Sequence, residues 1–186
     1  LVETDHSRVL VDCGLFQGLK DLRLRNWQPF PVAPSSIDAV LLTHAHIDHS
    51  GYLPALIRDG FVGRVYATEE TRKLCGILLP DCGSLQERDA SYANKVGFSK
   101  HKPAMALYTE QDGEKALASF EPVPFAQEVE ITPDLVARWM PAGHILGSAM
   151  ISLEIRDERR SRKVLFTGDL GRPSHPLLTA PSPLAE

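Results

Sequence analysis

Three histidines and one aspartate lie within six residues, inside the stretch Leu42–Gly51. Their order is His44-Ala45-His46-Ile47-Asp48-His49, and the apolar run Ala39–Leu42 leads into them. A short apolar run of this kind predicts a buried strand. If the strand continues briefly, His44 and His46 point to the same side, because side chains alternate along a strand. Neutral imidazole is a good zinc ligand, and two imidazoles on one side can share one ion.

The residues after the histidines predict a helix from Ser50 to about Asp59, with Pro54 in its first turn and Gly60 past its end. A turn before this helix would aim Asp48 and His49 at a second point close to the first. The segment can therefore begin two metal sites. The alternative is a histidine-rich loop that caps a strand. An isolated H-x-H would favour that alternative, whereas H-x-H-x-D-H between a strand and a helix favours metal binding.

Length and composition are those of an ordinary globular domain. The chain has 186 residues, of which 43% are hydrophobic and 24% charged. These values allow one domain with a sizeable core. The net charge of −4 does not indicate a nucleic-acid-binding protein, although a local basic patch would be compatible with one. No apolar run reaches the length of a membrane span. Three cysteines favour a reducing compartment, so we expect a cytoplasmic protein without a membrane partner.

Three further candidates each follow a predicted strand. Asp12 ends the strand Arg8–Asp12, which is expected to form a hairpin with Leu1–Thr4. His144 lies between two glycines, where the backbone can come close to a ligand. Asp169 follows an apolar strand near Lys163–Thr167. For both aspartates the alternative is a turn-forming residue with no role in a site.

The remaining pattern mixes strands and helices. A cap at Thr68 predicts a helix that Pro80 should kink or end, and the segment Leu19–Pro34 should be packed down by Trp27 and Phe30. The other predicted helices are Ser84–Val96 and Thr109–Ala118, the other predicted strands are Arg64–Ala67, Glu128–Ile131, Leu135–Met140 and Ala149–Ile155, and residues 156–162 should form a solvated hairpin turn. This α/β pattern predicts two sheets with helices outside, and strand ends that meet at one edge.

Counting the candidates gives enough ligands for two ions. One ion would take His44, His46 and His144, a second would take Asp48 and His49, and Asp169 would bridge them. Imidazoles and carboxylates without thiolates suit zinc, and manganese less well. Two ions about 3.5–4 Å apart can polarise a substrate oxygen and hold a water as hydroxide. Such a site predicts hydrolysis of esters, amides or phosphodiesters.

These segments resemble the metallo-β-lactamase superfamily, and more narrowly its β-CASP branch of RNA- and DNA-processing nucleases. The resemblance rests on the segments Val11–Gly18, Thr43–Pro54, Gly143–Ala149 and Phe166–Arg172. It implies an αββα sandwich, partial in this chain, and a nuclease with two zinc ions. It also implies that Asp12 supports the ligands without binding metal, and that the partner is single-stranded RNA. A homodimer of the full-length protein is left open.

The resemblance also predicts how this sequence relates to a longer protein. Residues 1–186 would be the amino-terminal part of the metallo-β-lactamase domain, with the β-CASP insert and the returning segment absent. The first metal site would then be complete and the second would lack one ligand. Two other functions remain open: a hydrolase of a small ester or thioester, and a non-catalytic scaffold subunit. The intact set of candidate ligands argues against the scaffold.

Overall fold

The computed structural model describes residues 1–156 and 161–183 and contains two β-sheets. The first sheet has the order β1-β2-β3-β4-β5, in which β1 is antiparallel to β2 and the other neighbours are parallel. The second sheet is antiparallel, with the order β6-β7-β8-β9. The strands are β1 Val2–Glu3, β2 Arg8–Val11, β3 Ala39–Leu41, β4 Arg64–Thr68, β5 Phe120–Val123, β6 Glu128–Thr132, β7 Leu135–Pro141, β8 Ala149–Arg156 and β9 Ser161–Phe166.

Alternation along β2 and β3 divides the core into two clusters. Leu10 and Val40 face the helices, whereas Val9 and Leu41 face the second sheet. Trp139 on β7 is fully buried between the sheets, and its indole N–H donates to the carbonyl of Leu42 at 3.0 Å. The first sheet is therefore covered on both faces, as expected for a largely parallel sheet.

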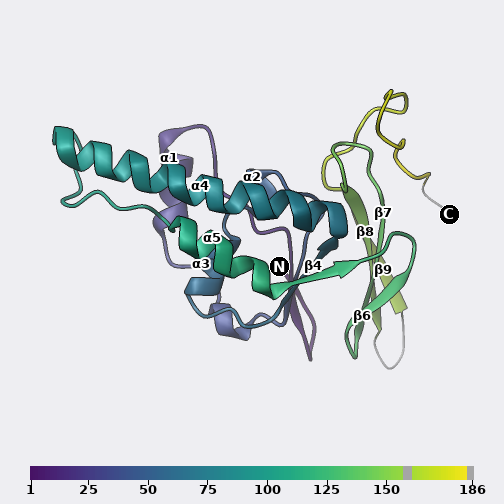
Figure 1. The fold of residues 1–186 in the computed structure, drawn as a ribbon. Helices are drawn as coiled ribbons and strands as arrows, with labels where there is room; N and C mark the ends of the chain where they lie inside the picture. Colours follow the sequence, from purple (N-terminus) through teal and green to yellow (C-terminus); the bar gives the residue numbers. More distant parts are fainter. Residues whose placement is uncertain (157–160, 184–186) are drawn as a thin grey trace.

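The helices of the described residues cover the outer face of the first sheet, and the second sheet lies on the opposite side (Figure 1). They are α1 Lys20–Arg23, α2 Ile47–Ser50, α3 Leu53–Arg58, α4 Glu69–Val96 and α5 Glu110–Ala116, with short 3-10 turns at Leu24–Trp27, Pro34–Ser36 and Leu117–Ser119. This arrangement confirms the predicted two-sheet α/β sandwich, in partial form. No helix in the described part of the chain is long and apolar enough to cross a membrane.

Helix α4 corrects the prediction that Pro80 kinks or ends the helix. It has 28 residues in all and continues through Pro80. Proline inside a helix costs about 3 kcal/mol. The cost is offset by packing, since Cys75 and Leu79 on the same helix are fully buried. Helix α5 also lies very close here: a Cβ on Gly113 would stand 2.7 Å from the carbonyl oxygen of Leu79. Tertiary contact therefore overrides the local tendency to break the helix.

Three other predictions are corrected by the structure. The helix after the histidines begins at Ile47 instead of Ser50 and is interrupted before α3. Trp27 is 55% exposed and does not pack the segment Leu19–Pro34 against the core. Phe30 does so alone, with its ring stacked on that of Tyr52 at a centroid distance of 5.6 Å. Strand β5 was not among the predicted strands; it contains a proline and forms at the edge of the sheet, where a missing N–H is tolerated.

The hairpins and the strand ends agree with the sequence. Strands β1 and β2 pair antiparallel, as predicted. The predicted turn at 156–162 lies largely outside the described residues, although Arg156 pairs with Ser161. Strands β2, β3 and β4 run parallel, so their carboxyl ends reach the same edge of the sheet. Ligand sites of α/β sheets are commonly found at such an edge.

Candidate metal centre

Four side chains from three separate segments meet at this edge. His44 and His46 follow β3, His144 follows β7 and Asp169 follows β9, and one potential ligand atom from each lies within 4.8 Å of the others. The Nε2 atom of His44 is 3.0 Å from Nδ1 of His46, and Nε2 of His144 is 3.2 Å from the same atom. These separations bring three ring nitrogens to one point.

The donor set and its spacing fit a zinc ion. Four ligand atoms around zinc at about 2.0–2.1 Å in a tetrahedron would lie roughly 3.3 Å from one another. The histidine pairs above match that spacing, and the Oδ2 atom of Asp169 is 3.4 Å from Nε2 of His144 and 3.9 Å from Nε2 of His44. Three imidazoles and one carboxylate are also the chemistry that zinc accepts. The cluster can therefore hold one metal ion.

Asp169 turns its second oxygen toward another pair of candidates. Its Oδ1 atom is 3.4 Å from Nε2 of His49, which is 4.0 Å from Oδ2 of Asp48. One carboxylate thus faces both groups, an arrangement suited to bridging two ions. Asp48 and Asp169 are 56% and 45% exposed, so this side of the centre is open to a substrate.

Asp12 holds the histidine-rich loop from behind. Its carboxylate accepts hydrogen bonds from the backbone N–H of Thr43 at 2.8 Å, from the hydroxyl of Thr43 at 2.8 Å and from Nδ1 of His49 at 2.7 Å. With a proton on Nδ1, His49 keeps the lone pair of Nε2 free for a metal. The same hydrogen bond raises the pKa of His49, against the opposing effect of burial. Asp12 sits at a φ of 61°, a conformation that aspartate tolerates better than most residues.

His44 is oriented in a similar way. Its Nδ1 atom lies 3.0 Å from the hydroxyl oxygen of Thr43, which already donates to Asp12, so the ring nitrogen donates to it. The Nε2 atom is then free to face the cluster. Burial, followed by the nearby His49 and His46, lowers the pKa of His44 to about 4. The imidazole is neutral at pH 7 and available as a ligand.

Other contacts position the loop that carries His144. The Ser148 hydroxyl accepts from the backbone N–H of His144 at 2.9 Å, and the Thr68 hydroxyl donates to the carbonyl of Gly147 at 2.7 Å. A Cβ on Gly171 would stand 1.7 Å from the carbonyl oxygen of Gly143, so glycine is needed where these two loops touch. Sequence reasoning assigned no role in the site to Ser148 or to Thr68, which was predicted only as the cap of α4.

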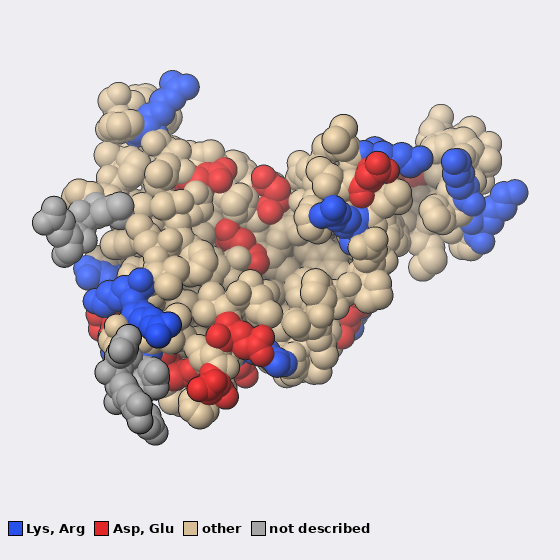
Figure 2. Space-filling model, turned by 180° about the vertical axis from the view of Figure 1, so that it is seen from behind, with Lys and Arg blue, Asp and Glu red and all other residues tan. Residues whose placement is uncertain are grey.

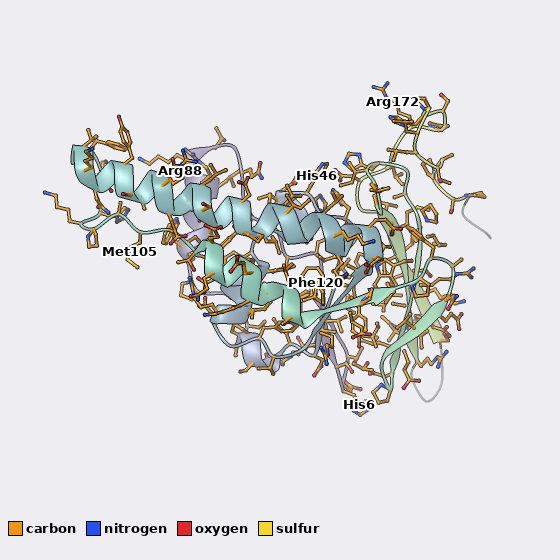
Figure 3. All side chains as sticks on the ribbon, in the orientation of Figure 1. His6, His46, Arg88, Met105, Phe120 and Arg172 are labelled. Carbon is orange, nitrogen blue, oxygen red and sulfur yellow. The ribbon has the colours of Figure 1, made fainter. Side chains whose placement is uncertain are left out.

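All seven residues singled out from the sequence lie at this edge, and their roles as ligands or supports remain predictions. The reason given for His44 and His46 was wrong, since β3 ends at Leu41 and neither histidine is in a strand. Their rings still converge through the turn that follows. Figure 3 shows His46 near the upper edge of the sandwich and His6 at the opposite edge. His101 is exposed in the loop after α4 and is not part of the cluster.

Two stacked sheets with a histidine–aspartate cluster at one edge define a class of metal-dependent hydrolase folds. The family model described as Metallo-beta-lactamase superfamily matches residues 1–184. The chain therefore belongs to the metallo-β-lactamase superfamily. A solved metallo-β-lactamase from Cronobacter sakazakii has the same fold, with a TM-score of 0.54 and 15% identity over 95% of this chain and 54% of that one.

Similar proteins of known name agree with the predicted β-CASP branch. Ribonuclease TTHA0252 of Thermus thermophilus is 36% identical over 96% of this chain and 36% of its own length. Transcription termination factor FttA of Methanocaldococcus jannaschii is 31% identical over 91% and 24%. Subunit 3-I of the cleavage and polyadenylation specificity factor of Arabidopsis thaliana is 33% identical over 89% and 21%. The chain thus spans only 21% to 36% of the length of these relatives.

Proposed function

We propose that this chain carries the metal centre of a nuclease that hydrolyses RNA phosphodiester bonds. The observation that supports the proposal best is the position of Asp169. Its two oxygens are divided between the His144 side and the His49 side of the centre, at 3.4 Å from each of these two rings. That division suits a two-metal hydrolase better than a structural site, which would be closed around one ion.

Each candidate residue would have a separate role. His44, His46 and His144 would hold the first ion, Asp48 and His49 the second, and Asp169 both, while Asp12 fixes the ring of His49. Bound zinc would supply an activated hydroxide and polarise the phosphate oxygen. Asp48, more than half exposed, faces the open side of the centre and would also lie nearest to an entering substrate.

The assignment of RNA as substrate rests on the relatives, of which one is named as a ribonuclease. The distribution of charged side chains on the surface is consistent with RNA contacts at several places. Figure 2 shows lysine and arginine side chains mainly toward the two ends of that view, with acidic side chains between them. Phosphate contacts would supply affinity independent of sequence. A single-stranded substrate is proposed because the resemblance to the β-CASP branch implies one.

Two further proposals concern the setting of the domain. We propose that residues 1–186 form the amino-terminal part of a metallo-β-lactamase domain, and that the protein acts in the cytoplasm. The three free thiols of Cys13, Cys75 and Cys82 agree with a reducing compartment.

A hydrolase of a small ester or thioester is the alternative from the same superfamily. The test compares cleavage of a labelled single-stranded RNA with hydrolysis of a thioester by the zinc-loaded protein. RNA cleavage that a chelator stops and zinc restores would support the nuclease. Thioester hydrolysis without RNA cleavage would support the alternative. A protein that binds no metal and has neither activity would indicate a scaffold.

A further inference from the structure

A cavity of about 620 Å³ opens beside Asp12. Pockets for small ligands commonly measure about 300–1,000 Å³. The loop after β2 forms one wall, and the 3-10 turn Leu24–Trp27 with the residues that follow it, up to Pro31, forms another. Its distinctive lining residues are Phe16, Arg25, Asn26, Gln28, Phe30 and Tyr52. The proposed hydrolysis assigns no role to any of them.

The first wall is fixed in place by hydrogen bonds. The Asn26 side chain accepts from the backbone N–H of Phe16 and donates to its carbonyl, each at 2.9 Å. Cys13 and Leu15 donate from the backbone to His49 and Ile47, at 2.7 and 3.0 Å. The loop that carries the Phe16 ring is thus tied to the histidine-rich loop. The cavity is already formed and needs little ordering when a ligand enters.

The chemistry of the lining is that of a nucleotide site. The Phe16 ring is 48% exposed, and the Arg25 guanidinium lies 5.7 Å from its centroid. Phe30 and Tyr52 stack at 5.6 Å on another side. Exposed aromatic rings are stacking platforms for the bases of single strands, and arginine adds charge for the phosphate. Amide groups such as that of Gln28 can hydrogen-bond a base edge.

The cavity also adjoins the support of the metal centre. Asp12 lines it while the carboxylate of the same residue holds His49 at 2.7 Å. We propose that the cavity binds one nucleotide of single-stranded RNA next to the bond that is cut, with its base on Phe16 and a phosphate beside Arg25. This inference rests on the proposed function, because it takes its ligand to be part of the nuclease substrate.

The test measures RNA binding and RNA cleavage separately. Binding of a fluorescent single-stranded oligoribonucleotide would be followed by anisotropy with a chelator present, so that affinity does not depend on metal. Phe16→Ala is expected to weaken binding roughly tenfold, the usual effect of removing one stacked base. Phe16→Trp should restore the affinity. Arg25→Ala should weaken binding and make it less dependent on salt.

Arg23→Ala is the matched control, since Arg23 is exposed two residues earlier and does not line the cavity. It should leave the affinity within twofold of the wild type. Circular dichroism and zinc content would show that each variant is folded and loaded. If Phe16→Ala and Arg25→Ala bind and cleave like the wild type, the cavity proposal is overturned and the nuclease stands.

The proposed nuclease can also fail while the cavity assignment holds. A wild-type protein that binds the oligonucleotide through Phe16 and Arg25 but never cleaves it would overturn the proposed nuclease and leave the cavity assignment in place. Adenosine 5′-monophosphate serves as the second probe. If it binds as tightly as the oligonucleotide, the site takes a free nucleotide, and the assignment to RNA is wrong.

Discussion

Replacing Asp12 by asparagine should separate support of the metal centre from support of the fold. Asparagine has nearly the same shape and tolerates the left-handed conformation that Asp12 adopts at a φ of 61°, so the backbone need not change. The amide, however, offers one acceptor oxygen where the carboxylate offers two. The native carboxylate accepts three hydrogen bonds, one of them on Oδ1 and two on Oδ2.

Either orientation of the new amide leaves a conflict. If its NH₂ group replaces Oδ1, it faces the backbone N–H of Thr43, donor against donor. If it replaces Oδ2, it faces Nδ1 of His49, and the ring must move its proton to Nε2 to accept. That change removes the lone pair that faces Asp169 at 3.4 Å. A lost hydrogen bond to a charged group costs about 1.5–3 kcal/mol of stability.

Metal affinity should fall as well, by about 10- to 100-fold, because partners behind the ligands fix their orientation and tautomer. Zinc competition titrations would measure the affinity, and chemical unfolding of the metal-free protein would measure the stability. The loss should be larger for the ion on the His49 side.

Asp134→Asn is the control. Asp134 is buried and, like Asp12, accepts three hydrogen bonds, here from the hydroxyl groups of Thr4, Ser7 and Thr132. It lies at the start of β7, about 20 Å of strand away from His144 at the other end. It should lose similar stability and keep its zinc affinity. An Asp12→Asn protein that binds zinc like the wild type would refute the tautomer argument, and equal zinc loss in both variants would point to general unfolding.

Four shorter predictions follow from the same geometry. Zinc titration of this chain should show one tight site and one looser site, because the cluster around His144 has four ligands and the other has three; two equally tight sites would contradict it. Asp169→Asn should abolish RNA cleavage and spare most binding, measured by separate cleavage and anisotropy assays, since one bridging carboxylate serves both ions; near-normal cleavage by the folded variant would exclude the two-metal mechanism. Burial raises the pKa of Asp134, but hydrogen bonds from Ser7, Thr4 and Thr132 outweigh burial and hold that pKa below its usual range. The wild type should therefore be more stable than Asp134→Asn at pH 7, and urea unfolding should show this difference shrinking as the pH falls below about 4. Gly171→Ala should reduce zinc affinity and stability together, because its Cβ would overlap the carbonyl of Gly143. Gly60→Ala is strained by a φ of 113° but has open space around its Cβ, so it should lower stability and leave zinc affinity unchanged.

The sequence by itself determined the chemistry of the centre and most of the strands. Histidines and aspartates placed directly after apolar runs identified the candidates, because strand ends are where side chains leave the core. The apolar run Ala39–Leu42 predicted a buried strand, since a run of neighbouring apolar residues is a local property of the chain. These features depend only on neighbouring residues, and neighbouring residues are what a sequence pattern contains.

Only the tertiary structure decided how the candidates meet. The ring nitrogens of His46 and His144 come within 3.2 Å although 98 residues separate them, and that closeness depends on how two sheets stack. The continuity of α4 through Pro80 depends on the packing of α5, which no local propensity reports. The three hydrogen bonds to Asp12 likewise join segments far apart in the chain. Such contacts are set by the free energy of the whole packed core, so the local pattern of residues leaves them open.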